Sequence, residues 1–225
     1  MYVTGAAMNQ NLAPTTSSST TLTVFTRPQR LTVRQRKNWM EILTSFDARN
    51  KYVVYDEVGN PVFNVEEQGS GFGSLVKRLF LRNLRPFSSH VEDLTGQGHL
   101  LALRKPFRFI FHRLEVRDAA GNLLGAIQRR WTWFRRKYAI EGPDGQEVAT
   151  LFGPFWRPWT FKILMAGNEQ EVGMIQKKWS GLIKEAFTDA DNFWVDFAAV
   201  TDPQLRAVLF AATVLIDIVH FENRN

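Results

Sequence analysis

Cysteine is absent from this chain of 225 residues, and its absence excludes several kinds of protein. Without a thiol there is no disulfide scaffold, no zinc-thiolate site, no cysteine nucleophile and no S-acyl lipid anchor. The lack of cysteine also fits a reducing compartment. Long hydrophobic runs are missing as well, because no apolar stretch reaches the roughly 18 residues expected of a membrane-spanning helix.

Residue combinations that carry covalent chemistry are equally scarce. The glycine-rich segment 69–73 lacks the Lys-Ser/Thr pair of a phosphate-binding loop, and no nucleophile elbow is present. The histidines show no metal-ligand spacing; they are His90, His99, His112 and His220. We therefore expect a protein that is not an enzyme.

The residues that are present suffice for a folded domain. Hydrophobic residues make up 44% of the chain, which is near the average for globular proteins. Residues 1–21 are rich in serine and threonine and predict a disordered tail, whereas residues 22–225 contain no second linker and predict one domain. Residues 1–11 lack the features of a secretory signal. We expect the protein to be cytoplasmic or membrane-associated on the cytosolic face of the plasma membrane, and not secreted.

Charge is distributed unevenly along the chain. The net charge is +6, but residues 71–137 contain 14 basic and four acidic residues, and residues 138–225 contain seven basic and 12 acidic residues. A basic middle third is typical of proteins with an anionic partner, such as membrane headgroups, nucleic acid or an acidic protein. Solvated basic strands explain the same charge without any partner.

An internal repeat indicates the architecture. The heptapeptide that begins at Gly125 recurs at Gly173 with three substitutions, an offset of 48 residues. At the same offset Leu103, Pro106 and Phe107 match Leu151, Pro154 and Phe155. A period of this size marks a repeated supersecondary unit.

Turn dipeptides between apolar segments predict five β-hairpins. These dipeptides are Gly59-Asn60, Gly96-Gln97, Gly121-Asn122, Asp144-Gly145 and Gly167-Asn168. An early pair of strands, residues 22–25 and 31–33, raises the expected number to about twelve. Residues 193–197 also alternate like a strand. So many strands favour closure into a barrel over one open sheet.

Three segments predict helices. Residues 34–46 have apolar side chains at helical spacing. Residues 73–85 are amphipathic, with one apolar and one basic arc, and the membrane-binding residues expected there are Lys77, Arg78, Leu79, Phe80, Arg82 and Arg85. Such a helix lies in a membrane surface or closes one end of a barrel with its arginines in water.

The third predicted helix, residues 204–221, is apolar on all sides over about ten residues. Its central residues are Leu209, Phe210, Val214, Leu215, Ile216 and Asp217. An apolar run of this length is typical of a buried core helix, and an aspartate is costly in hydrocarbon. A closed barrel around the helix would bury every side of it.

Aromatic and basic residues intermingle between residues 129 and 161. The aromatic ones are Trp131, Trp133, Phe134, Phe152, Phe155, Trp156, Trp159 and Phe161. Tryptophan beside arginine suits a membrane interface and also the stacking of nucleic-acid bases. We favour a third interpretation, in which tryptophans of the barrel core alternate with exposed arginines.

An acidic cluster offers a possible cation site. Asp189, Asp191, Asn192 and Asp196 supply oxygen ligands of the kind that calcium prefers. A turn that enters a strand uses the same residue types for hydrogen bonds to the backbone, and from the residues alone we favour the turn.

Residues 179–193 and 207–222 closely resemble the signature segments of the phospholipid scramblase family. Residues 50–63 and the tripeptide Arg85-Pro86-Phe87 are also similar. The resemblance extends over about residues 22–222. It implies a mainly β, tubby-like fold, a closed antiparallel barrel of twelve strands around a buried C-terminal hydrophobic helix.

The resemblance also implies calcium-stimulated, ATP-independent movement of phospholipids in both directions between membrane leaflets. Asp189 and Asp191 match the first and third positions of the family's proposed calcium segment, whose closing acid would fall on Val200. Relatives carry acylated cysteines that this chain lacks, and we hypothesise that helix 73–85 replaces them as the membrane contact. Anionic phospholipid membrane is therefore the expected partner.

An alternative remains open. A short buried helix offers no polar route for a headgroup, so the protein could be a peripheral barrel that binds anionic phospholipid or a protein partner without scrambling. A homo-oligomer that forms a groove would restore a route. Nucleic acid ranks below both as a partner.

Overall fold

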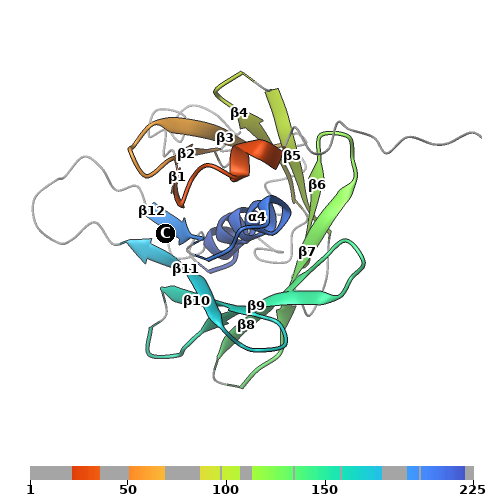
Figure 1. The fold of residues 1–225 in the computed structure, drawn as a ribbon, viewed down its shortest axis with the longest axis vertical. Coiled ribbons are helices and arrows are strands. Elements are labelled where there is room, and N and C mark those ends of the chain that lie inside the picture. The colour runs from red at the N-terminus through yellow and green to blue at the C-terminus, as the bar shows by residue number, and fades with distance from the viewer. Residues whose placement is uncertain are drawn as a thin grey trace, which may run out of the picture.

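Twelve antiparallel strands form a closed barrel around one long helix in the computed structural model (Figure 1). The structure describes residues 22–35, 51–68, 87–96, 98–106, 113–133, 135–157, 159–178, 192–197 and 199–220. Each strand pairs with its neighbours in sequence, and β1 pairs with β12 to close the ring. The predicted fold class, a mainly β barrel around a C-terminal helix, is confirmed.

The bounds of the elements follow chain order. They are η1 (Thr23–Phe25), β1 (Arg30–Gln35), β2 (Lys51–Tyr55), β3 (Pro61–Glu67), β4 (Phe87–Asp93), β5 (Gly98–Lys105), β6 (Arg113–Asp118), β7 (Leu123–Arg130), β8 (Arg136–Glu141), β9 (Glu147–Gly153), β10 (Thr160–Met165), β11 (Glu171–Lys178), β12 (Asn192–Asp196) and α4 (Pro203–His220).

The barrel has two unlike ends. One end, the turn rim, carries the short turns 56–60, 94–97, 119–122, 142–146 and 166–170 and the segment 197–202. The opposite end is called the loop rim. The strand ends that lie there are joined by the other connections, which are 36–50, 68–86, 106–112, 131–135, 154–159 and 179–191. This division follows from antiparallel pairing, because successive connections must alternate between the two ends.

All five predicted hairpins are confirmed, and their glycines explain why. Gly59, with φ of 95°, and Gly121, with φ of 87°, adopt the left-handed backbone that only glycine takes without a steric penalty. In each hairpin the strand register also shifts by one residue near the turn, for example between Val116 and Arg117. Such bulges bend strands and help a sheet to close.

Two predictions about the first ninety residues need correction. Residues 22–25 are not a strand, because residues 23–25 form the 3₁₀ helix η1; the twelfth strand is β12 instead. The predicted helix 34–46 cannot begin at Arg34, since Arg34 and Gln35 belong to β1 and pair with β2. The rest of that segment, the predicted tail 1–21 and the predicted helix 73–85 lie outside the described residues.

The two glycines of the internal repeat have the same packing role. Gly125 of β7 and Gly173 of β11 both lie directly after a bulge in the pairing with the preceding strand. A Cβ atom on Gly125 would overlap the backbone oxygen of Glu141, and one on Gly173 would overlap that of Asp196. Both glycines therefore allow a neighbouring chain to approach where a side chain would block it.

The helix α4 fills the barrel. Asp202 caps its first turn: its carboxylate accepts hydrogen bonds from the backbone N–H groups of Gln204 (3.0 Å) and Leu205 (3.2 Å). Every residue from Leu205 to Ile218 is buried, including Asp217, whose side chain is only 3% exposed. No described helix is both long and apolar enough to span a membrane.

A buried arginine links α4 by hydrogen bonds to two other segments at the turn rim. The Arg206 guanidinium of α4 donates from Nε to the carbonyl oxygen of Val200 (2.6 Å). Its Nη1 donates to the carbonyl oxygens of Phe25 and Thr26, both at 3.0 Å, and of Pro28 at 3.2 Å. Burial lowers the pKa of Arg206 from its usual value, yet the group stays charged at neutral pH. One side chain thus joins α4 to the segment around η1.

Candidate functional site: the loop rim of the barrel

Exposed aromatic residues gather at the loop rim. Trp131 (61% exposed) and Trp133 (78%) lie between β7 and β8, and Phe155 (73%) and Trp156 (74%) lie between β9 and β10. The two connections are neighbours, because β8 pairs with β9 along its whole length. Large apolar side chains are normally buried, so four of them exposed on adjacent loops require an explanation.

The two loops are folded locally. The rings of Trp131 and Trp133 pack edge to face with their centroids 4.8 Å apart, and the Thr132 hydroxyl donates to the carbonyl oxygen of Arg135. In the second loop the N–H of Arg157 donates to the carbonyl oxygen of Pro154 (3.2 Å). The exposed aromatics are therefore presented on tight turns.

This arrangement corrects the interpretation that we favoured from the sequence. Within the aromatic set, Phe161 is buried in the core and Trp159 packs partly against it, as that interpretation requires. Trp131, Trp133, Phe155 and Trp156 instead face solvent, so a core role is wrong for these four. Phe134 lies outside the described residues. The alternation of aromatic and basic residues did not distinguish strand from loop.

Basic side chains border the aromatic ones. The Arg135 guanidinium lies over the ring of Phe152 at 5.3 Å from its centroid, and that of Arg136 lies over Phe161 at 5.0 Å. Arg135 and Arg157 line an open cleft of 1070 Å³ on the outer face of β8, β9 and β10 together with Lys137 and Trp156. Cations stacked on aromatic faces gain electrostatic attraction. Glu147, Glu169 and Glu171 line the same cleft, so basic and acidic side chains both lie beside the aromatic loops.

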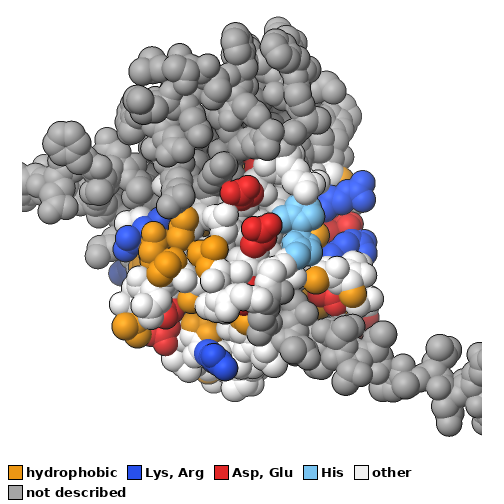
Figure 2. Space-filling model, turned by 90° about the horizontal axis from the view of Figure 1, so that it is seen from above, with side chains coloured by type: hydrophobic (Ala, Val, Ile, Leu, Met, Phe, Trp, Pro, Cys, Tyr) orange, Lys and Arg blue, Asp and Glu red, His pale blue; other side chains and the backbone are white. Residues whose placement is uncertain are grey.

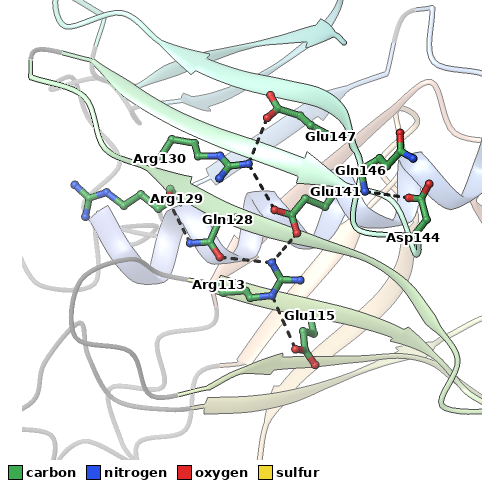
Figure 3. A network of polar contacts seen from close by, with 9 residues as sticks. All are labelled: Arg113, Glu115, Gln128, Arg129, Arg130, Glu141, Asp144, Gln146 and Glu147. Atoms are coloured by element: carbon green, nitrogen blue, oxygen red, sulfur yellow. Dashed lines mark hydrogen bonds and ion pairs between the residues drawn. The ribbon is translucent and has the colours of Figure 1, made fainter.

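A network of ion pairs supports the strands beneath these loops (Figure 3). Glu141 of β8 accepts from Arg113 of β6 at 2.6 Å and lies 3.7 Å from Arg130 of β7. Arg130, which directly precedes Trp131, also lies 3.5 Å from Glu147 of β9. Figure 3 shows Arg130 between the two carboxylates. The network links four consecutive strands and holds the base of the first aromatic loop.

The structure separates two of the predicted calcium ligands. Asn192 and Asp196 are the first and last residues of β12, about 13 Å apart at the rise of an extended strand. Asp196 is paired with Arg30 of β1 at 2.8 Å. Calcium binds oxygens at about 2.4 Å, so one ion cannot contact both residues.

Asn192 has one property that a cation ligand requires. Its side-chain oxygen Oδ1 is buried and has no hydrogen-bond partner, and a carbonyl oxygen is a ligand that calcium takes. Asp189 and Asp191 lie outside the described residues. Within the part of the chain that the structure describes, no group of three acidic or histidine residues is placed to hold a metal.

The other predicted site residues form two groups, one that the structure describes and one outside the described residues. The central-helix residues Leu209, Phe210, Val214, Leu215 and Ile216 are fully buried inside the barrel. The predicted membrane-binding residues Lys77, Arg78, Leu79, Phe80, Arg82 and Arg85 lie outside the described residues. The strands that flank them are described: β3 ends and β4 begins at the loop rim.

Sequence reasoning missed a histidine pair on the outer surface. The Nδ1 atoms of His90 on β4 and His99 on β5 lie 3.3 Å apart, and Glu92 pairs with His99 across the strands. Figure 2 shows histidine side chains beside acidic ones on this face. Burial and the charge of His90 lower the pKa of His99 below 6.5, against an opposing effect of Glu92.

This pair predicts a loss of stability in acid. The unfolded chain binds a proton at His99 near pH 6.5, while the folded chain does not until lower pH. Unfolding therefore takes up a proton in that interval, and the free energy of unfolding falls as pH drops through it. We expect urea denaturation to show a smaller fall between pH 7.5 and 5.5 for His99→Gln than for the wild type. Equal falls would contradict the assignment.

Together the fold and the rim define a class: closed twelve-stranded antiparallel barrels that enclose their own C-terminal helix and expose an aromatic, basic rim. The chain belongs to the Scramblase family, whose sequence model matches residues 8–223. Its relatives include phospholipid scramblase 1 of Mus musculus, 29% identical over 204 residues that cover 85% of this chain and 61% of the relative.

Two further relatives are similar over most of the chain. Phospholipid scramblase 2 of Bos taurus is 27% identical, and the matched region covers 89% of this chain and 71% of the relative. Phospholipid scramblase family member 5 of Homo sapiens is 22% identical, and the matched region covers 93% of this chain and 80% of the relative. The chain spans about three fifths of the length of the first curated relatives that it matches. No solved structure matches the chain.

Proposed function

We propose that this protein moves phospholipids between the two leaflets of a membrane, in both directions, without ATP and without a covalent reaction. The observation that carries the proposal is the match of the Scramblase family model to residues 8–223. The names of the relatives, phospholipid scramblases 1 and 2, supply the substrate class. The exposed aromatic and basic residues at the loop rim support an action at a membrane surface, which we place on the cytosolic face.

A second function competes with the first. The helix α4 is enclosed by strands, and a charged headgroup needs a polar route through about 30 Å of hydrocarbon. A protein that keeps α4 inside its barrel provides no such route through that helix. This observation favours a peripheral barrel that binds anionic phospholipid or a protein partner without translocating lipid.

We also propose that calcium stimulates the activity through Asp189, Asp191 and the side-chain oxygen of Asn192. The buried and unpartnered Oδ1 of Asn192 supports this site. The chemistry that calcium supplies is charge neutralisation between acidic protein groups and acidic phospholipid. Asp196, paired with Arg30, is left out of the proposed set.

A dithionite assay distinguishes the two functions. Liposomes carry a fluorescent phospholipid in both leaflets, and dithionite bleaches only the outer leaflet. With purified full-length protein we expect the inner-leaflet fluorescence to disappear while a trapped dye shows that the vesicles stay sealed. Persistent inner fluorescence, with protein bound to the vesicles, would reject translocation in favour of the binding barrel.

The same assay tests calcium. We expect calcium to accelerate the bleaching of the inner leaflet in the wild type and to have no effect on the double variant Asp189→Asn with Asp191→Asn. Asp196→Asn is the matched control, since it removes a nearby carboxylate outside the proposed set and should keep the calcium response. Loss of the response in the control alone would contradict the ligand assignment.

A further inference from the structure

We propose that the two aromatic loops of the loop rim, which contain residues 131–133 and 154–157, form the membrane-docking face, and that Trp131, Trp133, Phe155 and Trp156 enter the interface of an anionic phospholipid membrane. The inference rests on the proposed function for the presence of a membrane, and it adds the residues and the orientation of the barrel. In this orientation these two loops face the lipid and the turn rim faces the aqueous phase.

The exposure of the four aromatics is the first argument. Each is 61–78% exposed, and each offers a large ring to a partner surface. Tryptophan favours the headgroup level of a bilayer, where its ring contacts apolar chains while its N–H remains hydrated. Because the residues come from two adjacent loops, they can enter one flat surface together.

The charge of the two rims is the second argument. The turns 56–60, 142–146, 166–170 and the segment 197–202 contain five acidic residues, and the six turn-rim connections contain no basic residue. In contrast, the connections 131–135 and 154–159 contain Arg135 and Arg157 and no acidic residue. An anionic surface attracts these two aromatic loops and repels the acidic turns.

The acidic turns have a structural origin, so this polarity is built into the fold. The Asp56 carboxylate accepts from the N–H groups of Val58 (3.0 Å) and Asn60 (2.7 Å). Asp144 accepts from the N–H of Gln146 at 3.1 Å. Aspartate stabilises such turns through these bonds. Short turns at one end thereby concentrate negative charge opposite the aromatic rim.

Nucleic acid is the competing occupant, since bases also stack on tryptophan. The geometry favours the membrane because the rings of Trp131 and Trp133 already pack against each other, and the Arg135 guanidinium is stacked on Phe152. A base would need to separate that pair in order to stack between the rings, whereas a bilayer interface accepts the pair as it is.

The apolar contribution is tested with a double variant, Trp133→Ala with Trp156→Ala. Sedimentation of the full-length protein with phosphatidylcholine vesicles that contain phosphatidylserine should show a loss of affinity of about tenfold or more, given the apolar area withdrawn from lipid. The matched control is Val58→Ala with Leu94→Ala. Those side chains are 81% and 50% exposed on the turn rim, and binding should not change.

The charge contribution is tested with two variants of equal net charge. Arg135→Glu with Arg157→Glu and Arg27→Glu with Arg117→Glu each change the net charge from +6 to +2, a difference of two charges at each of two sites. We expect the first to abolish sedimentation and the second, at the opposite end of the barrel, to keep most of it. Circular dichroism and thermal denaturation show that each variant is folded.

Three results would overturn the docking face: unchanged vesicle binding by the tryptophan variant, an equal loss in the turn-rim controls, or variant-dependent binding of single-stranded oligonucleotides with vesicle binding unaffected. The outcome is separable from that of the proposed function. Rim-dependent binding with persistent inner-leaflet fluorescence rejects translocation and keeps the docking face. Scrambling that is insensitive to all the rim variants rejects the docking face and keeps translocation.

Discussion

Replacing Arg206 with methionine is expected to lower the free energy of unfolding by about 3 kcal/mol or more. Methionine fills a similar volume but cannot donate, so the carbonyl oxygens of Val200, Phe25, Thr26 and Pro28 lose a charged donor. Arg206 is only 5% exposed, so water cannot readily replace the lost hydrogen bonds. A buried acceptor without a donor costs more than an average hydrogen bond contributes.

Lysine should rescue only part of this loss. The guanidinium reaches Val200 with Nε and the segment around η1 with Nη1, and it also lies over the buried ring of Phe197 at 5.2 Å. An ammonium group is a single point and cannot span both sets of carbonyl oxygens. We expect the midpoint of urea unfolding of Arg206→Lys to lie between those of the wild type and of Arg206→Met.

The matched control for this prediction is Arg30→Met. Arg30 is paired with Asp196, but its side chain is 49% exposed, and exposed ion pairs contribute about 1 kcal/mol or less. Urea titration followed by tryptophan fluorescence gives the difference in unfolding free energy for both variants. If Arg206→Met proves no less stable than Arg30→Met, the buried arginine is not a net source of stability.

Alanine at Gly173 or Gly125 is expected to destabilise the barrel by about 3 kcal/mol or more. At both positions the added Cβ would overlap a backbone oxygen of the neighbouring strand. A flexible side chain could rotate away, but a backbone oxygen moves only with its strand. At Gly125 the Cβ would also lie 3.1 Å from a methyl carbon of Val208 on α4, so relief by tilting β7 inward is blocked.

Gly142→Ala provides the comparison. Its Cβ would meet the carboxylate of Asp144 at 3.0 Å and Val148 at 3.5 Å. The carboxylate can rotate into solvent with the loss of one exposed hydrogen bond, from the N–H of Gln146. We expect the midpoint of thermal unfolding to change little for Gly142→Ala and to fall strongly for each of the other two variants. The effects of Gly125→Ala and Gly173→Ala should add, since three strands separate β7 from β11 and the two overlaps involve different neighbours. A small, equal shift in all three variants would show that the barrel adapts to both overlaps.

The candidate site was predicted only in part. The sequence places Trp131, Trp133 and Trp156 among arginines, and that pattern is compatible with both a strand and a loop. What settles their exposure is that β7 and β9 end at Arg130 and Gly153, so these residues fall beyond the strands. A boundary of this kind depends on how far neighbouring strands continue to pair, which a local pattern does not contain.

Other features had no local signal at all. The partners of Arg206 lie up to 181 residues away, and the Arg30–Asp196 pair joins residues 166 apart. The pairing of β1 with β12 removes both free edges of the sheet. Contacts between such distant residues leave no spacing or period in the chain, so composition and motifs could not reveal them.

The sequence by itself determined the hairpins, the buried helix and the family, because each depends on local information. A glycine with positive φ specifies its turn, an apolar run of about ten residues specifies burial, and the signature segments are contiguous. Only the tertiary structure decided which aromatics face solvent, which end of the barrel is acidic, and what Arg206 holds together. Those properties arise when the ring closes, since closure alone brings distant strands and their connections to a common rim.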